Sequence, residues 1–256
     1  MTIQWITAFL DRPAGPFDTA VQFWMGATGS QLSEPRGELG EFATLVPPRG
    51  DAYLRVQRVQ NGGGSHLDLH VDDIEGLADR VAAAGARVEL ASRGPAVVWS
   101  PGGMPCCLAE HRGESTRPSP LTSGSGASSI VDQVCIDVAA GIFEEECRFW
   151  SVLTGWVLQS SSRHDEFKFL IRPAGSPLRV LLQRRRDNDG PTGAHLDIAS
   201  DDVKLIVADH LQLGATILEE FDNWTAMSDP AGFSYCVTAR NPRTGLLATP
   251  VPDYGA

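Results

Sequence analysis

The sequence lacks several features that would assign its class at once. No apolar stretch approaches the ~18 residues that span a membrane, and no basic-then-apolar leader stands at its start. Its five cysteines are odd in number and none are spaced as Cys-x-x-Cys, which fits reduced thiols rather than a disulfide framework. We therefore expect a cytoplasmic protein with no membrane partner.

Positive charge is also scarce. Lys and Arg number 21 against 32 Asp and Glu, which gives a formal net charge of -11. Nucleic-acid surfaces need clustered basic residues, and the one basic run, Arg184–Arg186, is followed at once by Asp187 and Asp189. The composition argues against nucleic acid as a partner and weakly favours a neutral or cationic ligand over an anionic one.

Several motifs of catalysis and nucleotide binding are missing as well. The glycines at 62–64 precede a strand-like segment instead of following one, so they do not resemble a phosphate loop. No Gly-x-Ser-x-Gly elbow occurs. Cys107 and Cys236 have no basic neighbour in sequence that would lower a thiol pKa, and we interpret them as packing residues rather than nucleophiles.

What the sequence does contain is an internal repeat. The dipeptide Phe-Trp occurs at 23–24 and again at 149–150, a spacing of 126 residues. The tripeptide His-Leu-Asp occurs at 66–68 and again at 195–197, a spacing of 129 residues. A nearly constant spacing with one short insertion is the pattern of a duplicated domain.

The repeat predicts two domains joined by a linker. Residues 113–129 are rich in Ser, Gly and Pro and show no apolar periodicity. We expect domain 1 at 1–112 and domain 2 at 130–252, each large enough to bury its own core. Because a tandem chain can pair its domains internally, both a monomer and a homodimer are compatible with it.

Helical and strand-like segments alternate within each copy. Apolar residues within 17–24 lie at helical spacing, and a second helix is expected to end at Gly85, with its twin ending at Gly214. His210 of the twin takes the place of Val81, and we interpret it as a packing residue. The expected strands are 5–10, 52–59, 65–71 and 106–109 in the first copy and 131–138, 167–171, 178–184, 195–199 and 234–238 in the second. This order predicts an α+β fold with helices on one face of a curved sheet and a cup on the other.

Three segments carry a family resemblance. HLDLHVDD at 66–73, HLDIASDDV at 195–203 and WTAMSDPAGFSYCV at 224–237 resemble signatures of the vicinal-oxygen-chelate superfamily of glyoxalases, bleomycin-resistance proteins and extradiol dioxygenases. The resemblance implies tandem glyoxalase-like domains, each of paired βαβββ modules with curved mixed sheets. It leaves the reaction open, because that superfamily includes lyases, isomerases, dioxygenases and metal-free binding proteins.

The same resemblance places candidate site residues in each cup. Metal-dependent members hold a divalent ion with His or Glu from four strands. The corresponding positions are Thr7, Gln57, His66 and Cys107 in the first copy and Gln133, Gln183, His195 and Cys236 in the second. Only one histidine remains per cup, and Gln and neutral Cys are poor ligands. We add Asp68, Asp197 and Trp224 as ligand-binding residues and assign no catalytic residue.

Two functions follow, and whether the protein is an enzyme stays open. The first is binding of a small organic molecule, an aromatic or apolar metabolite or antibiotic, in a cup without a standard metal site or other cofactor. The alternative is a divalent-metal-dependent lyase, isomerase or dioxygenase with His66 or His195 as ligand. A regulatory domain pair with one vestigial cup is a third reading. The second cup is favoured as the working one, because it retains Trp224 and the Asp-Pro-Ala-Gly turn at 229–232.

Overall fold

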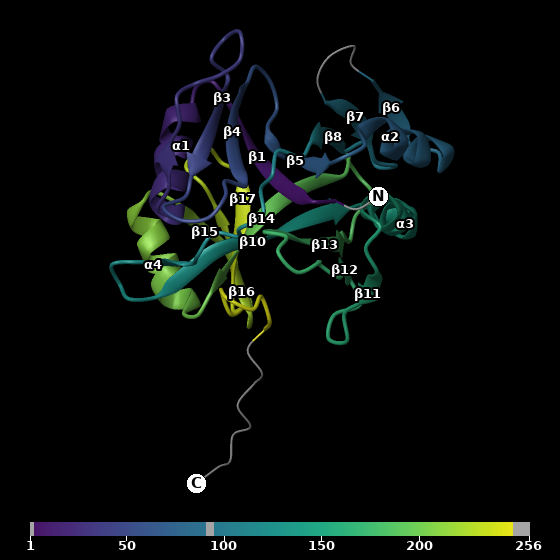
Figure 1. Ribbon diagram of the computed structural model, residues 1–256. Helices are drawn as coiled ribbons and strands as arrows, with labels where there is room; N and C mark the ends of the chain where they lie inside the picture. Colours follow the sequence, from purple (N-terminus) through teal and green to yellow (C-terminus); the bar gives the residue numbers. More distant parts are fainter. Residues whose placement is uncertain (1–2, 91–94, 248–256) are drawn as a thin grey trace.

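Both copies of the repeat fold into the same order of strands and helices in the computed structural model, which describes residues 3–90 and 95–247 (Figure 1). The first copy consists of β1 (Trp5–Pro13), α1 (Phe17–Thr28), β2 (Gln31–Leu32), β3 (Phe42–Val46), β4 (Leu54–Val59), β5 (Gly64–Val71), α2 (Ile74–Ala83), β6 (Arg87–Glu89), β7 (Ala96–Trp99) and β8 (Pro105–Glu110). The second consists of β10 (Ser128–Val138), the 3-10 helix η1 (Ala140–Ile142), α3 (Phe143–Thr154), β11 (Leu158–Ser160), β12 (Phe167–Leu170), β13 (Arg179–Arg184), β14 (Gly193–Ser200), α4 (Val203–Gln212), β15 (Thr216–Glu220), β16 (Trp224–Ser228) and β17 (Ser234–Thr238). The predicted α+β fold is confirmed.

Each copy builds its own sheet. The strand order is β2-β3-β4-β1-β5-β8-β7-β6 in the first and β11-β12-β13-β10-β14-β17-β16-β15 in the second. In both sheets the two central strands run antiparallel to each other and parallel to their outer neighbours, so the sheets are mixed. The cups therefore form within the copies and not between them. The sheets are open, because the strand order of each ends in edge strands.

Local sequence signals account for the helix ends. Helices α2 and α4 begin after Asp73 and Asp202, whose carboxylates accept hydrogen bonds from backbone N–H groups of the first turn. Helices α1 and α3 end at Gly29 and Gly155, which have φ of 64° and 70°. Glycine adopts this left-handed conformation without steric cost, so it terminates a helix readily.

Several strands were not predicted. These are β2, β3, β6, β7, β11, β15 and β16, short strands at or next to the sheet edges, where few residues are buried and the apolar signal is weak. Within the predicted linker, Leu121–Thr122 form β9 and pair with the start of β10. None of the helices in the described part of the chain is long and apolar enough to cross a membrane. The outer boundaries of the two domains stay predictions.

Helices from opposite copies pack together. Helix α1 contacts α4 on one side of the molecule, and α2 contacts α3 on the other (Figure 1). The ring of Phe23 lies 5.5 Å from the rings of both His210 and Tyr235. The two sheets meet where β5 lies against β14. The copies thus share one continuous apolar core.

Two buried carboxylates tie the copies together at equivalent places. Asp229, in the turn before β17, forms an ion pair with Arg12 of β1 at 2.8 Å and accepts a hydrogen bond from Trp24 Nε1 at 3.1 Å. Glu146 of α3 accepts from Trp150 Nε1 at 2.9 Å and from the backbone N–H of Gly102 in the other copy, also at 2.9 Å. In each case an indole N–H and a turn share one carboxylate, which satisfies groups that would otherwise be buried without partners.

Candidate functional site

Each cup contains a histidine–aspartate pair on neighbouring central strands. His195 Nδ1 of β14 lies 2.7 Å from Asp137 Oδ2 of β10, and His66 Nδ1 of β5 lies 2.6 Å from Asp11 Oδ2 of β1. The strand register explains the pairing, because His195 stands opposite Cys135 and side chains two residues apart share a face. A carboxylate on Nδ1 fixes the orientation of the imidazole and directs Nε2 into the cup.

In the second cup, Nε2 of His195 faces two further groups. Asp197 Oδ1 lies 3.4 Å away and Cys236 Sγ lies 3.6 Å away. Burial lowers the pKa of His195, but Cys135, Asp137 and Asp197 outweigh this and hold that pKa well above 6.5. Nε2 of His195 thus lies between a carboxylate and a thiol at the base of the cup.

The two glutamines of the second cup hold the network in place. Gln133 Nε2 donates to Asp197 Oδ2, while its Oε1 accepts from Arg240 Nη2 at 3.1 Å. Gln183 Oε1 accepts a weak hydrogen bond from Cys135 Sγ at 3.4 Å. The carbonyl oxygens of both amides thus accept hydrogen bonds from neighbouring side chains.

A cavity of about 460 Å³ opens over this network. One wall is aromatic: the ring of Trp224 lies 6.0 Å from that of Phe167, 5.9 Å from that of His164 and 4.5 Å from that of Phe221. All six second-copy residues that we selected from the sequence line the cavity, namely Gln133, Gln183, His195, Asp197, Trp224 and Cys236. The size and mixed lining suit a small organic molecule.

The first cup is filled by its own side chains. Phe9 stands opposite His66, where the second copy has Cys135, and stacks on His66 with ring centroids 4.4 Å apart and planes 14° apart. Arg55 lies over the other side of this group, 5.5 Å from the Phe9 ring, and ion-pairs with Asp68 at 3.5 Å. Phe9 is 5% exposed, so little of its ring is left open.

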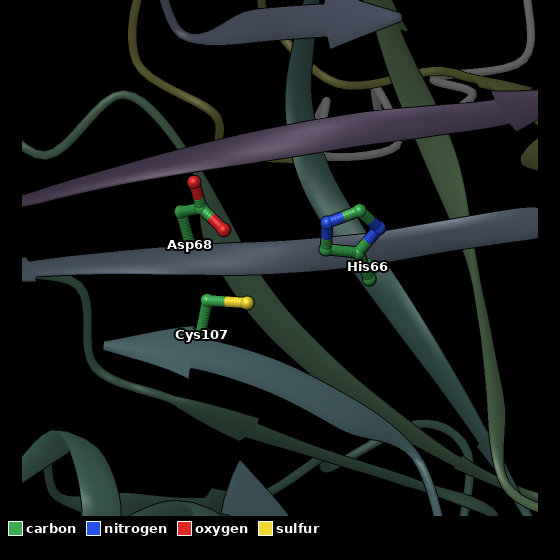
Figure 2. Close-up of side chains that lie close together, drawn as sticks. All are labelled: His66, Asp68 and Cys107. Atoms are coloured by element: carbon green, nitrogen blue, oxygen red, sulfur yellow. The ribbon is translucent and has the colours of Figure 1, made fainter. Parts of the chain in front are cut away.

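The other first-copy candidates lie around this cluster. Figure 2 shows Cys107 on β8, the strand beside the one that carries His66 and Asp68. Gln57 stands on β4 opposite Asp11. Thr7, by contrast, is used structurally, since its hydroxyl lies 2.9 Å from His70 Nε2 inside the fold.

Two clusters have the residue types of a metal site. Ligand atoms of His66, Asp68 and Cys107 lie within 4.8 Å of one another, as do those of Cys135, His195 and Asp197. The second set contains Cys135 where the sequence indicated Cys236.

These donors fit a divalent metal poorly. Metal ligands must be deprotonated, whereas burial raises the pKa of Cys107 to about 12 and that of Cys135 beyond its ordinary range. The neighbours of His195 raise the pKa of its imidazole, which favours the proton over a metal ion at that nitrogen. At the four positions that the superfamily uses in the second cup, Gln133 and Gln183 are held by other side chains, which leaves one imidazole and one protonated thiol. This set does not make a standard site.

Some site residues were missed in the sequence. Asp11 and Asp137 stand 126 residues apart, so the repeat itself could have revealed them. Arg179 and Arg240 line the second cavity without any local signal, because their partners come from distant segments.

Comparison with known proteins supports the duplicated architecture. A family model described as "Glyoxalase-like domain" matches residues 7–109 and 133–238, one segment in each copy. A variant of 4-hydroxymandelate synthase from Streptomyces coelicolor has a similar structure, with a TM-score of 0.64 and 16% identity over 97% of this chain and 95% of that one.

Two dioxygenases have comparable likeness. The 2,2',3-trihydroxybiphenyl 1,2-dioxygenase of Sphingomonas wittichii strain RW1 has a TM-score of 0.62 and 17% identity over 93% of this chain and 90% of that one. The 2,3-dioxygenase LapB of Pseudomonas sp. KL28 has a TM-score of 0.63 and 12% identity over 97% and 94%. At these identities the likeness establishes the fold alone. No curated protein matches the chain in sequence.

Proposed function

Because the chain belongs to the glyoxalase-like domain family of the vicinal-oxygen-chelate superfamily, we propose that it binds a small, mainly aromatic organic molecule in the cup of its second copy, without a standard metal site. The observation that carries this proposal is the cavity of about 460 Å³ over the His195 network. Cavities of several hundred Å³ with apolar walls and a few fixed polar groups are typical small-molecule sites.

The chemistry of the lining supports this reading. Phe167, Phe169 and Trp224 offer ring faces and edges to a planar ligand, which aromatic pairs favour in offset or edge-to-face geometry. His195, whose ring is fixed by Asp137, offers Nε2 for a hydrogen bond to the ligand. The similar structures include a dioxygenase named for a trihydroxybiphenyl, which is an aromatic compound of compatible kind.

In metal-dependent members of the superfamily the ion polarises paired oxygens of the substrate. The alternative of a metal-dependent enzyme has one observation in its favour: Asp137 binds Nδ1 of His195, as carboxylates commonly do for metal-ligating histidines. Against it stand the protonated thiols and the occupied glutamines. The binding role is therefore the better supported of the two.

The test is a binding titration with a panel of one- and two-ring aromatic compounds, in the presence of EDTA. Quenching of tryptophan fluorescence would report binding, and mass spectrometry would show whether the recovered compound is unchanged. We expect one saturable site per chain and no chemical change. Trp224→Ala should remove most of the signal and weaken binding, whereas Trp99→Ala, in β7 of the first copy, should leave the affinity unchanged.

Other outcomes would decide against the proposal. Turnover of a panel compound after metal is restored, together with loss of that metal in His195→Ala, would establish the enzyme alternative. Saturable binding that survives Trp224→Ala but is lost when residues of the first cup are substituted would show that the ligand binds in the first copy instead of the second.

A further inference from the structure

We infer that the ligand of the second cup carries a carboxylate, which Arg179 of β13 and Arg240, two residues beyond β17, hold between them. This inference rests on the proposed function, because it specifies the chemical class of molecule that binds in that cup. Four observations support it.

The first is the charge of the lining, which is opposite to that of the chain. The chain carries a formal net charge of -11. The cavity is nevertheless lined by three arginines and one carboxylate, namely Arg163, Arg179, Arg240 and Asp197. Clefts lined by one sign of charge concentrate ligands of the other sign, so this cup selects an anion in spite of the acidic surface.

The second observation is that the two guanidinium groups are held side by side. Arg179 Nη1 donates to the backbone carbonyl of Gly245 at 2.5 Å, and Arg240 Nη1 donates to the same oxygen at 3.2 Å. Gln133 fixes Arg240 from the other side. Two like charges that share one neutral acceptor repel each other, and an anion placed between them would remove that repulsion.

The third observation is the shortage of counter-charge around them. Among residues 3–90 and 95–247, neither arginine forms an ion pair with a carboxylate. Arg117 and Arg172, which belong to the same electrostatic cluster, donate only to backbone carbonyls. In the described part of the chain, four arginines thus surround one fully buried carboxylate, Asp132.

Asp132 does not neutralise the cluster. It is the extra residue of a bulge in β10, and its oxygens have no hydrogen-bond partner. Burial raises the pKa of Asp132 to about 6, although the arginines act to lower it. At neutral pH it supplies at most one negative charge for four positive ones.

The fourth observation is the position of the pair relative to the aromatic wall. The guanidinium of Arg179 lies 5.7 Å from the centre of the Phe169 ring, so charge and aromatic surface adjoin in one cavity. A planar carboxylate matches the fork of a guanidinium, and an attached ring would lie against Phe169 and Trp224. An aromatic carboxylate therefore satisfies both parts of the lining at once.

The first cup provides a built-in control. Its cup arginine, Arg55, is already ion-paired with Asp68 and lies over the ring of Phe9. Leu181 takes the place of Arg55 in the second copy, facing the cavity. Substitution of Arg55 therefore removes an arginine that also lies beside an aromatic ring in a cup, but leaves the inferred anion site unchanged.

The experiment compares each acid with its uncharged amide on the full chain by isothermal titration calorimetry, using phenylacetate against phenylacetamide and 2-naphthoate against 2-naphthamide. We expect each acid to bind about 10- to 100-fold more tightly than its amide, the range for a charge-assisted hydrogen bond. Arg179→Gln and Arg240→Gln should each remove most of this preference. Arg55→Gln should leave it unchanged, and Asp132→Asn should increase it, because that change removes the opposing charge.

Each other result would overturn the inference in a recognisable way. Equal affinity for acid and amide, or binding of the amides alone, would show that the cup does not recognise a carboxylate. The proposal of an aromatic ligand would still stand. Tighter binding of phenyl phosphate than of phenylacetate would contradict the carboxylate and indicate that the natural ligand carries a phosphoryl group. If the acids bind but Arg179→Gln and Arg240→Gln both keep the preference, the anion lies elsewhere. Failure of all these compounds and of the wider aromatic panel would contradict the proposed function itself.

Discussion

The two cups share a backbone and a histidine–aspartate pair, but the cavity of about 460 Å³ lies over the pair of the second copy. The difference lies in what stands opposite the histidine. Phe9 stacks on His66 in the first cup, whereas the smaller Cys135 stands opposite His195 in the second, and His195 lines the cavity. The two copies thus differ in side-chain volume at one equivalent position of a central strand, and in a close-packed interior such a difference is filled or left as space.

The same comparison extends to the aspartates two residues beyond each histidine. Asp68 is paired with Arg55 from its own sheet, and this pair helps to fill the first cup. Asp197 is held by Gln133 instead, and its second oxygen lies 3.4 Å from His195 Nε2. A duplicated sequence thus keeps the acidic residue in both copies but pairs it with different side chains in each.

The largest effect on ligand affinity should come from placing the aromatic residue of the first cup at the equivalent position of the second. Cys135→Phe would place a ring over His195, fill the cavity, and reduce ligand affinity by about 100-fold or more, because the ligand would lose most of its buried surface. Calorimetric titration with the best compound of the aromatic panel would measure this.

Cys135→Ala is the matched control, since it removes the thiol without filling the space. It should retain affinity within a few-fold. Undiminished binding to folded Cys135→Phe protein would show that the ligand does not lie over His195, and the contrast between the cups would then have another origin.

The opposite change tests the packing of the first cup. Phe9→Ala should lower the free energy of unfolding by about 3 to 5 kcal/mol, as large aromatic-to-alanine changes in a core do. Urea denaturation would measure it, and the affinity of the second cup should not change. A loss well below 1 kcal/mol would mean that Phe9 does not fill the first cup.

A smaller effect, on the pH dependence of stability, distinguishes α4 of the second copy from α2 of the first. His210 of α4 is buried against Tyr235, with Nδ1 2.9 Å from the tyrosine hydroxyl, and burial lowers the pKa of His210 to about 4. Its unfolded pKa is near 6.5, so its contribution to stability is complete above pH 6.5 and is lost as the pH falls from there toward 4. The loss amounts to about 3 kcal/mol at most.

His210→Val, which copies Val81 of the first copy, should abolish this part of the acid sensitivity. Urea unfolding at pH 5 and at pH 7.5 would compare the two proteins. The wild type should lose more stability than the variant between these values, and parallel losses would show that His210 is not the group responsible.

Much of this architecture could be predicted from the sequence. The repeat required two domains of one kind, and Gly29, Gly155, Asp73 and Asp202 set helix ends by local rules that need no tertiary information. The second-cup candidates also converge, because the family resemblance aligned them on neighbouring strands.

The remainder depends on contacts that no local pattern encodes. Phe9 has the apolar character of any buried strand residue, so its role in closing one cup emerges only beside Cys135. Arg179 and Arg240 owe their positions to Gly245 and Gln133, which lie far apart in sequence. The net charge of the chain favours a neutral or cationic ligand, whereas the cavity lining leads us to infer an anion, because an overall sum does not report how charges are distributed around a cavity.

The carboxylate of Asp229 bears on how the chain folds as it is synthesised. Arg12 and Trp24 leave the ribosome early, but the residue that neutralises one and accepts from the other comes more than 200 positions later. Until then the nascent first half holds an unpaired guanidinium and an exposed aromatic helix face. The native contacts of these two first-copy residues are therefore completed only after Asp229 has been synthesised, which makes the final packing of the first copy depend on the second.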